Sequence, residues 1–354
     1  MQNTTCGKYH NFGNSFIILD ETQNIMVAES EKKDYSIRIL NSDTGIGADG
    51  LVVLSAPKVL KAEKNDSGHT PDNIDCIFRH FEPDGSESLL CLNGLLVTGL
   101  YLSRLLDKPR VSVLAATNAR TPQVLCLGVD DHKGAFVEGL HTSRADKCLA
   151  DPGVILPFLP GIDKITPLEL NFRQDDIAGL DIVNSRICLS GYLVFSGEPH
   201  LVVFTDQMKD QHGLTNLVFQ DPSENRRASL GDRLIHAMGM RIQNNFGHLF
   251  PKGLNLTFVH MSQAPGSGLP CIEYRCFERA INKETLSCGT AALACSAVAQ
   301  ALNLAKIEQT PIFPYLYNRY HPDSFYTLTP HTPQQGLWRI TGNPEQISDN
   351  ICFL

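Results

Sequence analysis

The chain lacks several patterns that would place it in common functional classes. It has no basic run longer than pairs such as Lys32-Lys33 and Arg226-Arg227, and its net charge is −8. Both features argue against a nucleic-acid-binding surface. No apolar stretch approaches the ~20 residues of a membrane span, and the first 30 residues hold no apolar segment of signal-peptide type. We therefore expect a cytoplasmic protein that binds neither nucleic acid nor membrane.

Familiar metal-binding and catalytic motifs are missing as well. No two cysteines have CxxC spacing, and no HxxxH or HExxH pattern occurs, so a metal site lacks ligands. There is no GxSxG nucleophile motif. The 11 cysteines are an odd number in a chain without a secretion signal, which argues against a disulfide scaffold. We expect no metal site.

The composition is that of an ordinary globular protein with about two domains. The 354 residues are 42% hydrophobic and 19% charged. Prolines crowd a segment around Asp151-Pro152-Gly153 and at Pro157, Pro160 and Pro167, which predicts a linker. We therefore place one domain at 1–150 and the other at 151–336. The extended tail at about 337–354 is expected to return and complete the first sheet.

Short apolar runs between turn residues predict strands in both halves of the chain. They lie at 16–19, 51–54, 76–78, 111–114 and 123–127, and then at 193–195, 201–204, 256–259 and 272–277. Helical spacing predicts helices at 93–106, 223–240 and 288–302. The polar insert at 63–73 is expected to be an exposed loop.

One glycine-rich string resembles a nucleotide-binding motif only in its letters. Gly45-Ile46-Gly47-Ala48-Asp49-Gly50 satisfies G-x-G-x-x-G, but a genuine fingerprint follows a strand and opens a helix. Here a polar segment at 41–44 precedes the string and a strand-like run at 51–54 follows it. The context predicts a tight turn into a strand.

Two cysteines stand in matched settings in the two halves. Glu87-Ser88-Leu89-Leu90 leads to Cys91, Glu284-Thr285-Leu286-Ser287 leads to Cys288, and an apolar helix-like stretch follows each cysteine. The start of a helix lowers the pKa of a thiol from about 8.5 and binds carboxylates through unpaired N–H groups. A single cysteine there is usually ordinary packing. Two matched copies favour two half-domains that bring thiols to opposite faces of one bound molecule, as a proton exchange requires.

With these residues in view, the chain resembles diaminopimelate epimerase and the pyridoxal-independent amino-acid racemases related to it. The resemblance covers most of the chain. The motifs that carry it are Lys8-Tyr9-His10 through Gly13-Asn14 to Phe16, the string 45–50, Asp84-Gly85-Ser86-Glu87, Asn93-Gly94, Gly197-Glu198-Pro199-His200, 250–255, Glu278-Arg279 and Cys288-Gly289-Thr290.

The resemblance implies an α/β fold of the α+β class with two pseudo-symmetric lobes. Each lobe would be a mainly antiparallel sheet wrapped around a central helix, with the active site in the cleft between them. Cys91 and Cys288 would act as thiolate base and thiol acid, with no cofactor and no metal. The residues implied to bind the substrate are Asn14, Glu82, Asn93, Gly94, Glu198, His200, Asn255, Glu278, Arg279, Gly289 and Thr290.

The departures from the family pattern concern the distal end of the substrate. The family has asparagine where this chain has Glu82 and Glu198. Leu92 replaces a glycine after the first cysteine, and Ala280 replaces one in a loop that is one residue longer. The two added carboxylates would repel the distal carboxylate of diaminopimelate and suit a cationic side chain.

We therefore predict a racemase for a basic amino acid: histidine, lysine, ornithine or arginine. Two alternatives stay open. Glu82 or Glu198 could pair with Arg279 or point away, which would leave diaminopimelate as the substrate, or the scaffold could be a binding protein without activity. The only partner expected is a small amino-acid substrate, and a homodimer is left open.

Overall fold

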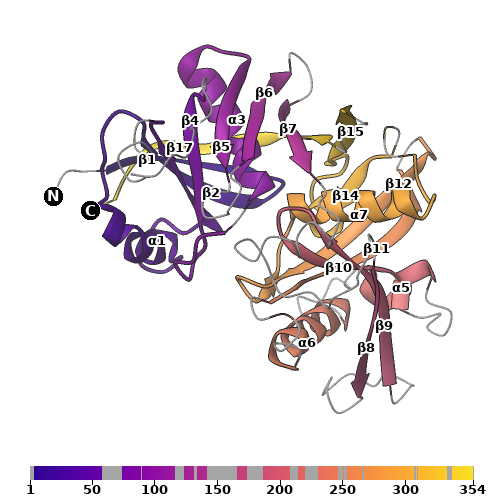
Figure 1. Cartoon of the computed structure of the whole chain (residues 1–354). Coiled ribbons are helices and arrows are strands. Elements are labelled where there is room, and N and C mark those ends of the chain that lie inside the picture. Colours follow the sequence, from indigo (N-terminus) through magenta and orange to yellow (C-terminus); the bar gives the residue numbers. More distant parts are fainter. Residues whose placement is uncertain are drawn as a thin grey trace, which may run out of the picture. The chain divides into compact units, whose positions relative to one another are not determined.

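The computed structural model describes residues 4–57, 74–88, 90–115, 123–130, 134–141, 166–173, 186–207, 214–219, 230–245, 250, 253–264, 267–306, 308, 310–332 and 337–353. The chain divides into two compact units, whose elements are labelled in Figure 1. Unit 1 comprises Met1–His141 and Thr329–Leu354, and unit 2 comprises Thr142–Leu328. The expected domain boundary near 151–153 and the polar insert at 63–73 lie outside the described residues.

Unit 1 contains a ten-stranded sheet of order β15-β16-β7-β6-β5-β4-β3-β2-β1-β17. The strands are β1 (Thr4–Asn11), β2 (Asn14–Glu21), β3 (Gly50–Ser55), β4 (Cys76–Phe81), β5 (Arg110–Ala115), β6 (Gln123–Asp130), β7 (Gly134–His141), β15 (Thr327–Thr332), β16 (Leu337–Gly342) and β17 (Pro344–Phe353). The pairs β2–β3 and β4–β5 are parallel, whereas β1–β2, β3–β4 and β5–β6–β7 are antiparallel. The C-terminal strands join this sheet, because β17 pairs with β1 and β16 with β7.

Helix α3 (Leu92–Leu106) is the central element of unit 1. It contacts β1 and β17 near one end of the strand order and β6, β7 and β16 near the other. Its side chains are apolar on nearly every face, and Leu95, Leu96 and Val97 are fully buried, as expected of a helix enclosed by a sheet. It ends at Leu106, and the C-cap residue Asp107 has a left-handed backbone with φ 51°. The predicted helix at 93–106 is confirmed.

The glycine-rich string joins a helix to a strand. Helix α1 (Lys32–Leu40) precedes it, packed through Tyr35 and Ile39 on a core with β2 and β3, and β3 begins at its last residue. Asp49 accepts hydrogen bonds from the Ser15 N–H at 2.9 Å and from the Ser15 hydroxyl at 3.0 Å. The string thus fastens the start of β2 to the start of β3. The predicted turn into a strand is confirmed.

Unit 2 contains a seven-stranded sheet of order β13-β12-β11-β10-β9-β8, with β14 paired to β12. The strands are β8 (Thr166–Arg173), β9 (Arg186–Phe195), β10 (Pro199–Phe204), β11 (Asn255–Gln263), β12 (Pro270–Glu278), β13 (Lys283–Glu284) and β14 (Ile312–Pro314). Pro167 lies within β8 rather than in the expected linker. A proline is tolerated there because β8 is at the edge of the sheet.

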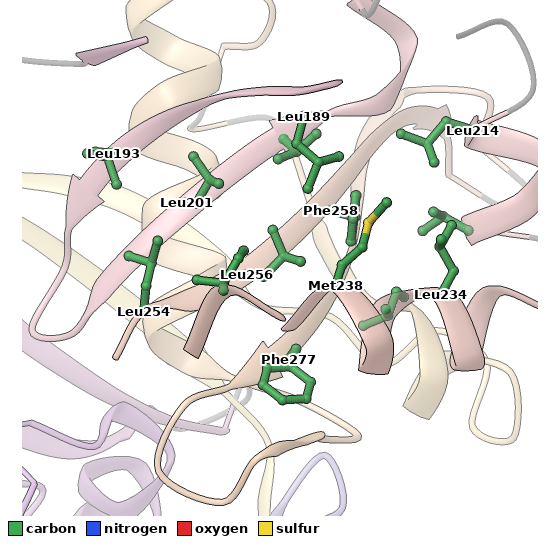
Figure 2. Close-up of a cluster of buried hydrophobic side chains, with 14 of the residues drawn as sticks. Leu189, Leu193, Leu201, Leu214, Leu234, Met238, Leu254, Leu256, Phe258 and Phe277 are labelled. Atoms are coloured by element: carbon green, nitrogen blue, oxygen red, sulfur yellow. The ribbon is translucent and has the colours of Figure 1, made fainter. Parts of the chain in front are cut away.

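Helices α6 (Leu230–Asn245) and α7 (Gly289–Ala301) pack on the sheet of unit 2, and α5 (Leu214–Val218) packs beside α6. Leu234 and Met238 of α6 meet Leu201, Leu256 and other buried side chains in the cluster drawn in Figure 2. The prediction of a helix at 223–240 ended too early, because α6 continues to Asn245. Residues 220–229 lie outside the described part of the chain.

The two units repeat one order of elements, as the predicted pseudo-symmetry requires. In each, a hairpin (β1–β2 or β9–β10) is followed by a helix (α1 or α6). The next strand (β3 or β11) pairs in parallel with the second strand of the hairpin. The strand after that (β4 or β12) pairs antiparallel with it and leads through a loop to a cysteine and the apolar helix (α3 or α7). A further strand (β5 or β14) then pairs in parallel with β4 or β12. The fold is therefore α+β, dominated by two sheets. None of the described helices is long and apolar enough to cross a membrane.

Candidate active site

Cys91 is the N-cap residue of α3, where its extended backbone has φ −123° and ψ 104°. Its sulfur accepts a hydrogen bond from the Gly94 N–H at 3.4 Å. A Cβ at position 94 would lie 3.4 Å from that sulfur and 3.2 Å from the Phe78 ring, so glycine allows the close approach. The half-buried thiol therefore lies beside the N–H groups of the first helical turn, the environment that the sequence predicts.

Asn93 links this helix start to the first hairpin. Its carbonyl oxygen accepts from the Asn11 amide at 2.9 Å, and its own amide donates to the Asn14 oxygen at 3.0 Å. Asn93 is 1% exposed, so its side chain is enclosed by these partners. The structure thus brings Asn14, Cys91, Asn93 and Gly94 together in unit 1, with Asn93 orienting Asn14.

Glu82 lies one residue beyond the end of β4, next to a buried histidine. The carboxylate is 3.5 Å from His80 Nδ1, which also lies 2.6 Å from the Ser88 hydroxyl. Burial lowers the pKa of His80 to about 4. The ring is therefore neutral at physiological pH, and it does not neutralise the charge of Glu82.

Cys288 is the N-cap residue of α7 in nearly the same conformation as Cys91, with φ −138° and ψ 113°. Its backbone is held on both sides by Tyr274. The Cys288 N–H donates to the phenol oxygen at 3.0 Å, and the phenol donates to the Cys288 carbonyl at 2.9 Å. Burial raises the pKa of Tyr274 well above its ordinary value, so the phenol keeps the proton that it donates.

The sulfur of Cys288 meets side chains rather than a backbone cap. It lies 3.2 Å from the Thr290 hydroxyl. Thr290 Oγ1 also lies 3.0 Å from His200 Nε2. The other ring nitrogen, Nδ1, is 3.0 Å from the Thr257 hydroxyl. Both nitrogens of this fully buried ring are thus engaged by protein groups, and His200 lies behind Thr290.

Glu198 and Arg279 form an ion pair. Arg279 Nε donates to Glu198 Oε2 at 2.9 Å and Nη2 donates to the same oxygen. Asn255 accepts from the Arg279 N–H at 2.9 Å, and Glu278 accepts from the Thr285 hydroxyl. Within the described residues, Glu198 Oε1 is buried and has no hydrogen-bond partner.

A second repeat, outside the tetrads and motifs named above, accompanies the two cysteines. Phe78-Arg79-His80-Phe81 ends β4 and Glu82 follows it, and Tyr274-Arg275-Cys276-Phe277-Glu278 ends β12. Each arginine makes a two-pronged ion pair with the glutamate four residues before the cysteine. Arg79 reaches Glu87 at 3.0 and 2.7 Å, and Arg275 reaches Glu284 with two bonds of 2.6 Å.

These pairs explain why the tetrads before the cysteines are alike. Each folds the loop back onto its strand: Glu87 bridges to Phe81, and Glu284 pairs with Phe277. The fold thereby carries the cysteine to the start of the central helix in both units. The signal was the shared pattern aromatic-Arg-x-Phe-Glu, which is visible in the printed sequence.

The predicted site residues form two clusters, one in each unit. Unit 1 holds Asn14, Cys91, Asn93 and Gly94, with Glu82 beside His80, and unit 2 holds Glu198, His200, Asn255, Glu278, Arg279, Cys288, Gly289 and Thr290. Among the described residues, no group of three or more histidines, cysteines or carboxylates is arranged to hold a metal ion.

Known proteins resemble this chain over most of its length, although no family model matches it. A diaminopimelate epimerase from Archaeoglobus fulgidus is 25% identical over 300 residues, which is 84% of this chain and 81% of that protein. One from Methanocella arvoryzae is 28% identical over 306 residues, covering 86% and 84%.

Solved structures share the fold. A probable proline racemase from Agrobacterium radiobacter K84 has a TM-score of 0.56 at 13% identity, over 99% of this chain and 93% of that one. A hydroxyproline epimerase from Agrobacterium vitis has a TM-score of 0.54 at 13% identity, over 99% and 92%. These structures share the fold, and the sequence relatives support the resemblance that the motifs predict. The chain is an isomerase that is similar to the diaminopimelate epimerases over most of its length.

Proposed function

We propose that this isomerase inverts the α-carbon of an amino acid by proton exchange between Cys91 and Cys288. One sulfur, as thiolate, removes the α-proton, and the other, as thiol, delivers a proton to the opposite face. The observation that carries this proposal is the placement of one cysteine at the N-cap of the central helix in each unit. The reaction requires one sulfur as thiolate and the other as thiol.

The helix starts would also stabilise the charge that develops during the reaction. An α-hydrogen is a very weak acid, so the carbanion-like transition state needs strong stabilisation. The N–H groups of the first turn of a helix bind a carboxylate and offer fixed dipoles that need no reorganisation. Asn93 and Gly94 in unit 1, and Gly289 and Thr290 in unit 2, would supply these groups.

For the substrate we propose a basic amino acid: lysine, ornithine, arginine or histidine. The formal charges of Glu198, Glu278 and Arg279 sum to −1; Glu198 pairs with the Arg279 guanidinium, and Glu278 accepts from the Thr285 hydroxyl. Glu198 engages Arg279 through Oε2 alone and keeps the buried acceptor Oε1. An N–H group of a cationic side chain would satisfy that acceptor, whereas a distal carboxylate would be repelled.

Diaminopimelate is the second candidate, because the curated sequence relatives are diaminopimelate epimerases. The Glu198–Arg279 pair bears on this choice in two ways. It neutralises one added carboxylate, which would favour diaminopimelate. It also occupies the guanidinium that a distal carboxylate would otherwise approach, which would favour a cation.

Chiral chromatography after incubation with each L-amino acid and with LL-diaminopimelate tests the choice. We expect racemisation of at least one basic amino acid by the reduced protein. Glu198→Asn should weaken that activity and improve turnover of diaminopimelate. Turnover of diaminopimelate alone by the unmodified chain would overturn the substrate proposal and keep the reaction class. Absence of turnover across the panel would favour a binding protein on this scaffold.

A further inference from the structure

We infer that Tyr274 is a positioning residue for Cys288: its phenol holds both polar groups of the Cys288 backbone and so fixes the sulfur at the start of α7. The inference rests on the proposed function, in which Cys288 gives and takes the α-proton. The side chain of Tyr274 is buried, and both hydrogen bonds of its hydroxyl group go to Cys288. Tyr274 would therefore act through Cys288 rather than on the substrate.

Tyr274 lies in the interior of the sheet of unit 2. It pairs with Val259 of β11 on one side and with Pro314 of β14 on the other. The Cys288 N–H donates to its oxygen at 3.0 Å, and the phenol donates to the Cys288 carbonyl at 2.9 Å. The same carbonyl accepts the Ala292 N–H at 3.1 Å, which is the first hydrogen bond of α7. A side chain anchored between two strands thus holds the residue at which the helix begins.

Unit 1 holds its cysteine in another way. The residue that matches Tyr274 in the aromatic-Arg-x-Phe-Glu repeat is Phe78, which has no hydroxyl group. There the Cys91 sulfur itself accepts the Gly94 N–H. In the part of the chain that the structure describes, the Cys288 sulfur accepts no such hydrogen bond from the start of α7. The bond that fixes the cysteine is therefore on the sulfur in unit 1 and on the backbone in unit 2.

Bonds to the backbone suit a sulfur that changes its protonation state. Neither bond of the Tyr274 phenol involves the sulfur, so both can persist while Cys288 passes between thiol and thiolate. The sulfur would then keep one position relative to the first turn of α7. Misplacement of a reacting group by about 1 Å can slow catalysis by about 10²-fold. We therefore expect the Tyr274 hydroxyl to affect the rate of proton transfer rather than substrate binding.

Amide hydrogen exchange of the protein labelled with ¹⁵N-cysteine tests the two bonds without substrate. Tyr274→Phe removes the hydroxyl and keeps the ring, as Phe78 does in unit 1. We expect exchange of the Cys288 N–H to accelerate by about tenfold, because it loses its acceptor. Exchange at Cys271 and Cys276, which lie in the same strand as Tyr274, should stay unchanged. Tyr274→Met serves the same purpose if the phenylalanine variant does not fold.

Turnover tests the effect on the reaction. The values of kcat and KM are measured from α-proton exchange in D₂O, with the amino acid that the unmodified protein racemises. For Tyr274→Phe we expect kcat to fall by about tenfold and KM to change by less than about twofold. Tyr315→Phe is the control, because it removes another phenol hydrogen bond of unit 2, the one to the Phe219 carbonyl. It should leave kcat, KM and the exchange of the Cys288 N–H unchanged.

Unchanged exchange of the Cys288 N–H in Tyr274→Phe would overturn the inference. An unchanged kcat in a variant whose Cys288 exchange has accelerated would also overturn it. Equal acceleration at Cys271 and Cys276 would do the same, because the hydroxyl would then stabilise the whole strand. Failure of the proposed function is a different result, in which the unmodified protein racemises no amino acid. The inferred effect on proton transfer would fall with it, while amide exchange would still decide whether the phenol holds Cys288.

Discussion

Replacing Glu284 by glutamine should destabilise unit 2 more than the matching change at Glu87 destabilises unit 1. The two glutamates hold equivalent positions, each paired with an arginine at the end of the preceding strand. Their burial differs. The side chains of Arg275 and Glu284 are 0% and 10% exposed, whereas those of Arg79 and Glu87 are both 20% exposed.

The expected magnitudes follow from that difference. Removing one partner of a buried ion pair costs about 3–5 kcal/mol, because it leaves a charge without its counterpart. Asp232 still neutralises Arg275 and glutamine still accepts one bond, so we expect about 3 kcal/mol for Glu284→Gln. The more exposed pair with Glu87 should cost about 1 kcal/mol. For an m-value of about 3 kcal/mol/M, these costs lower the urea midpoint by about 1 M and about 0.3 M.

Urea titration with a separate reporter for each unit measures these effects. The single tryptophan, Trp338, is buried in β16 and reports on unit 1. Hydrogen exchange of peptides from β12 reports on unit 2. Glu284→Gln should also raise the exchange of the loop at 279–287, because its anchor to Arg275 is weakened. Equal losses in the two variants, or a larger loss for Glu87→Gln, would refute the reasoning from burial.

Three further predictions concern buried or paired groups. Hydrogen bonding to Asp206 raises the pKa of His260. The pair should therefore stabilise the fold below about pH 6.5 and lose that effect as pH rises through the folded-state pKa. The difference in unfolding free energy between the unmodified protein and His260→Gln, measured over a pH series, should show this loss. Burial lowers the pKa of His200 to about 3, so stability should fall as pH drops from 6.5 toward that value. Because Asn255 accepts from the Arg279 N–H and its amide therefore donates to His200 Nε2, ¹⁵N NMR at neutral pH should show the Nδ1–H tautomer. A Cβ at Gly50 would lie 2.1 Å from His80 Nε2, so Gly50→Ala should cost about 2 kcal/mol in urea titration; an unchanged midpoint would contradict this packing.

The sequence indicated the elements whose signal is local. The central helices were predictable because Leu92–Leu106 and Gly289–Ala301 are apolar on nearly all faces and follow the repeated tetrads. The strands predicted around positions 16–19, 51–54, 201–204 and 272–277 correspond to β2, β3, β10 and β12. Their buried, mostly apolar runs are bounded by turn residues, and this pattern predicts strands.

Elements with a weaker apolar pattern were missed. Helix α1 begins Lys32-Lys33-Asp34 and buries only part of one face, and β1 mixes Thr4 and Thr5 with Lys8. The later end of α6 was missed as well, although Ile242 near it is fully buried. Gly239 lies inside that helix because a Cβ there would meet the Phe277 ring at 2.3 Å.

The site was predictable in its residue types and not in their connections. The motifs named the cysteines and Glu198, but the pairing of Glu198 with Arg279, 81 residues away, was only one of the open alternatives, because no local spacing decides it. Likewise, Thr257 donates to the Cys276 sulfur at 3.4 Å because the register of β11 and β12 places the two residues side by side. Such contacts arise from sheet pairing rather than from spacing along the chain.

The central claim is that Cys91 and Cys288 exchange the α-proton of one substrate from opposite faces. The most direct measurement is exchange of the α-proton with D₂O, followed by ¹H NMR, for the reduced protein and for Cys91→Ala and Cys288→Ala. Cys126→Ala is the control, since that half-buried cysteine lies in β6. We expect each site variant to lose exchange of the α-proton and the control to retain it. Exchange by either site variant at the rate of the unmodified protein would contradict the two-thiol mechanism.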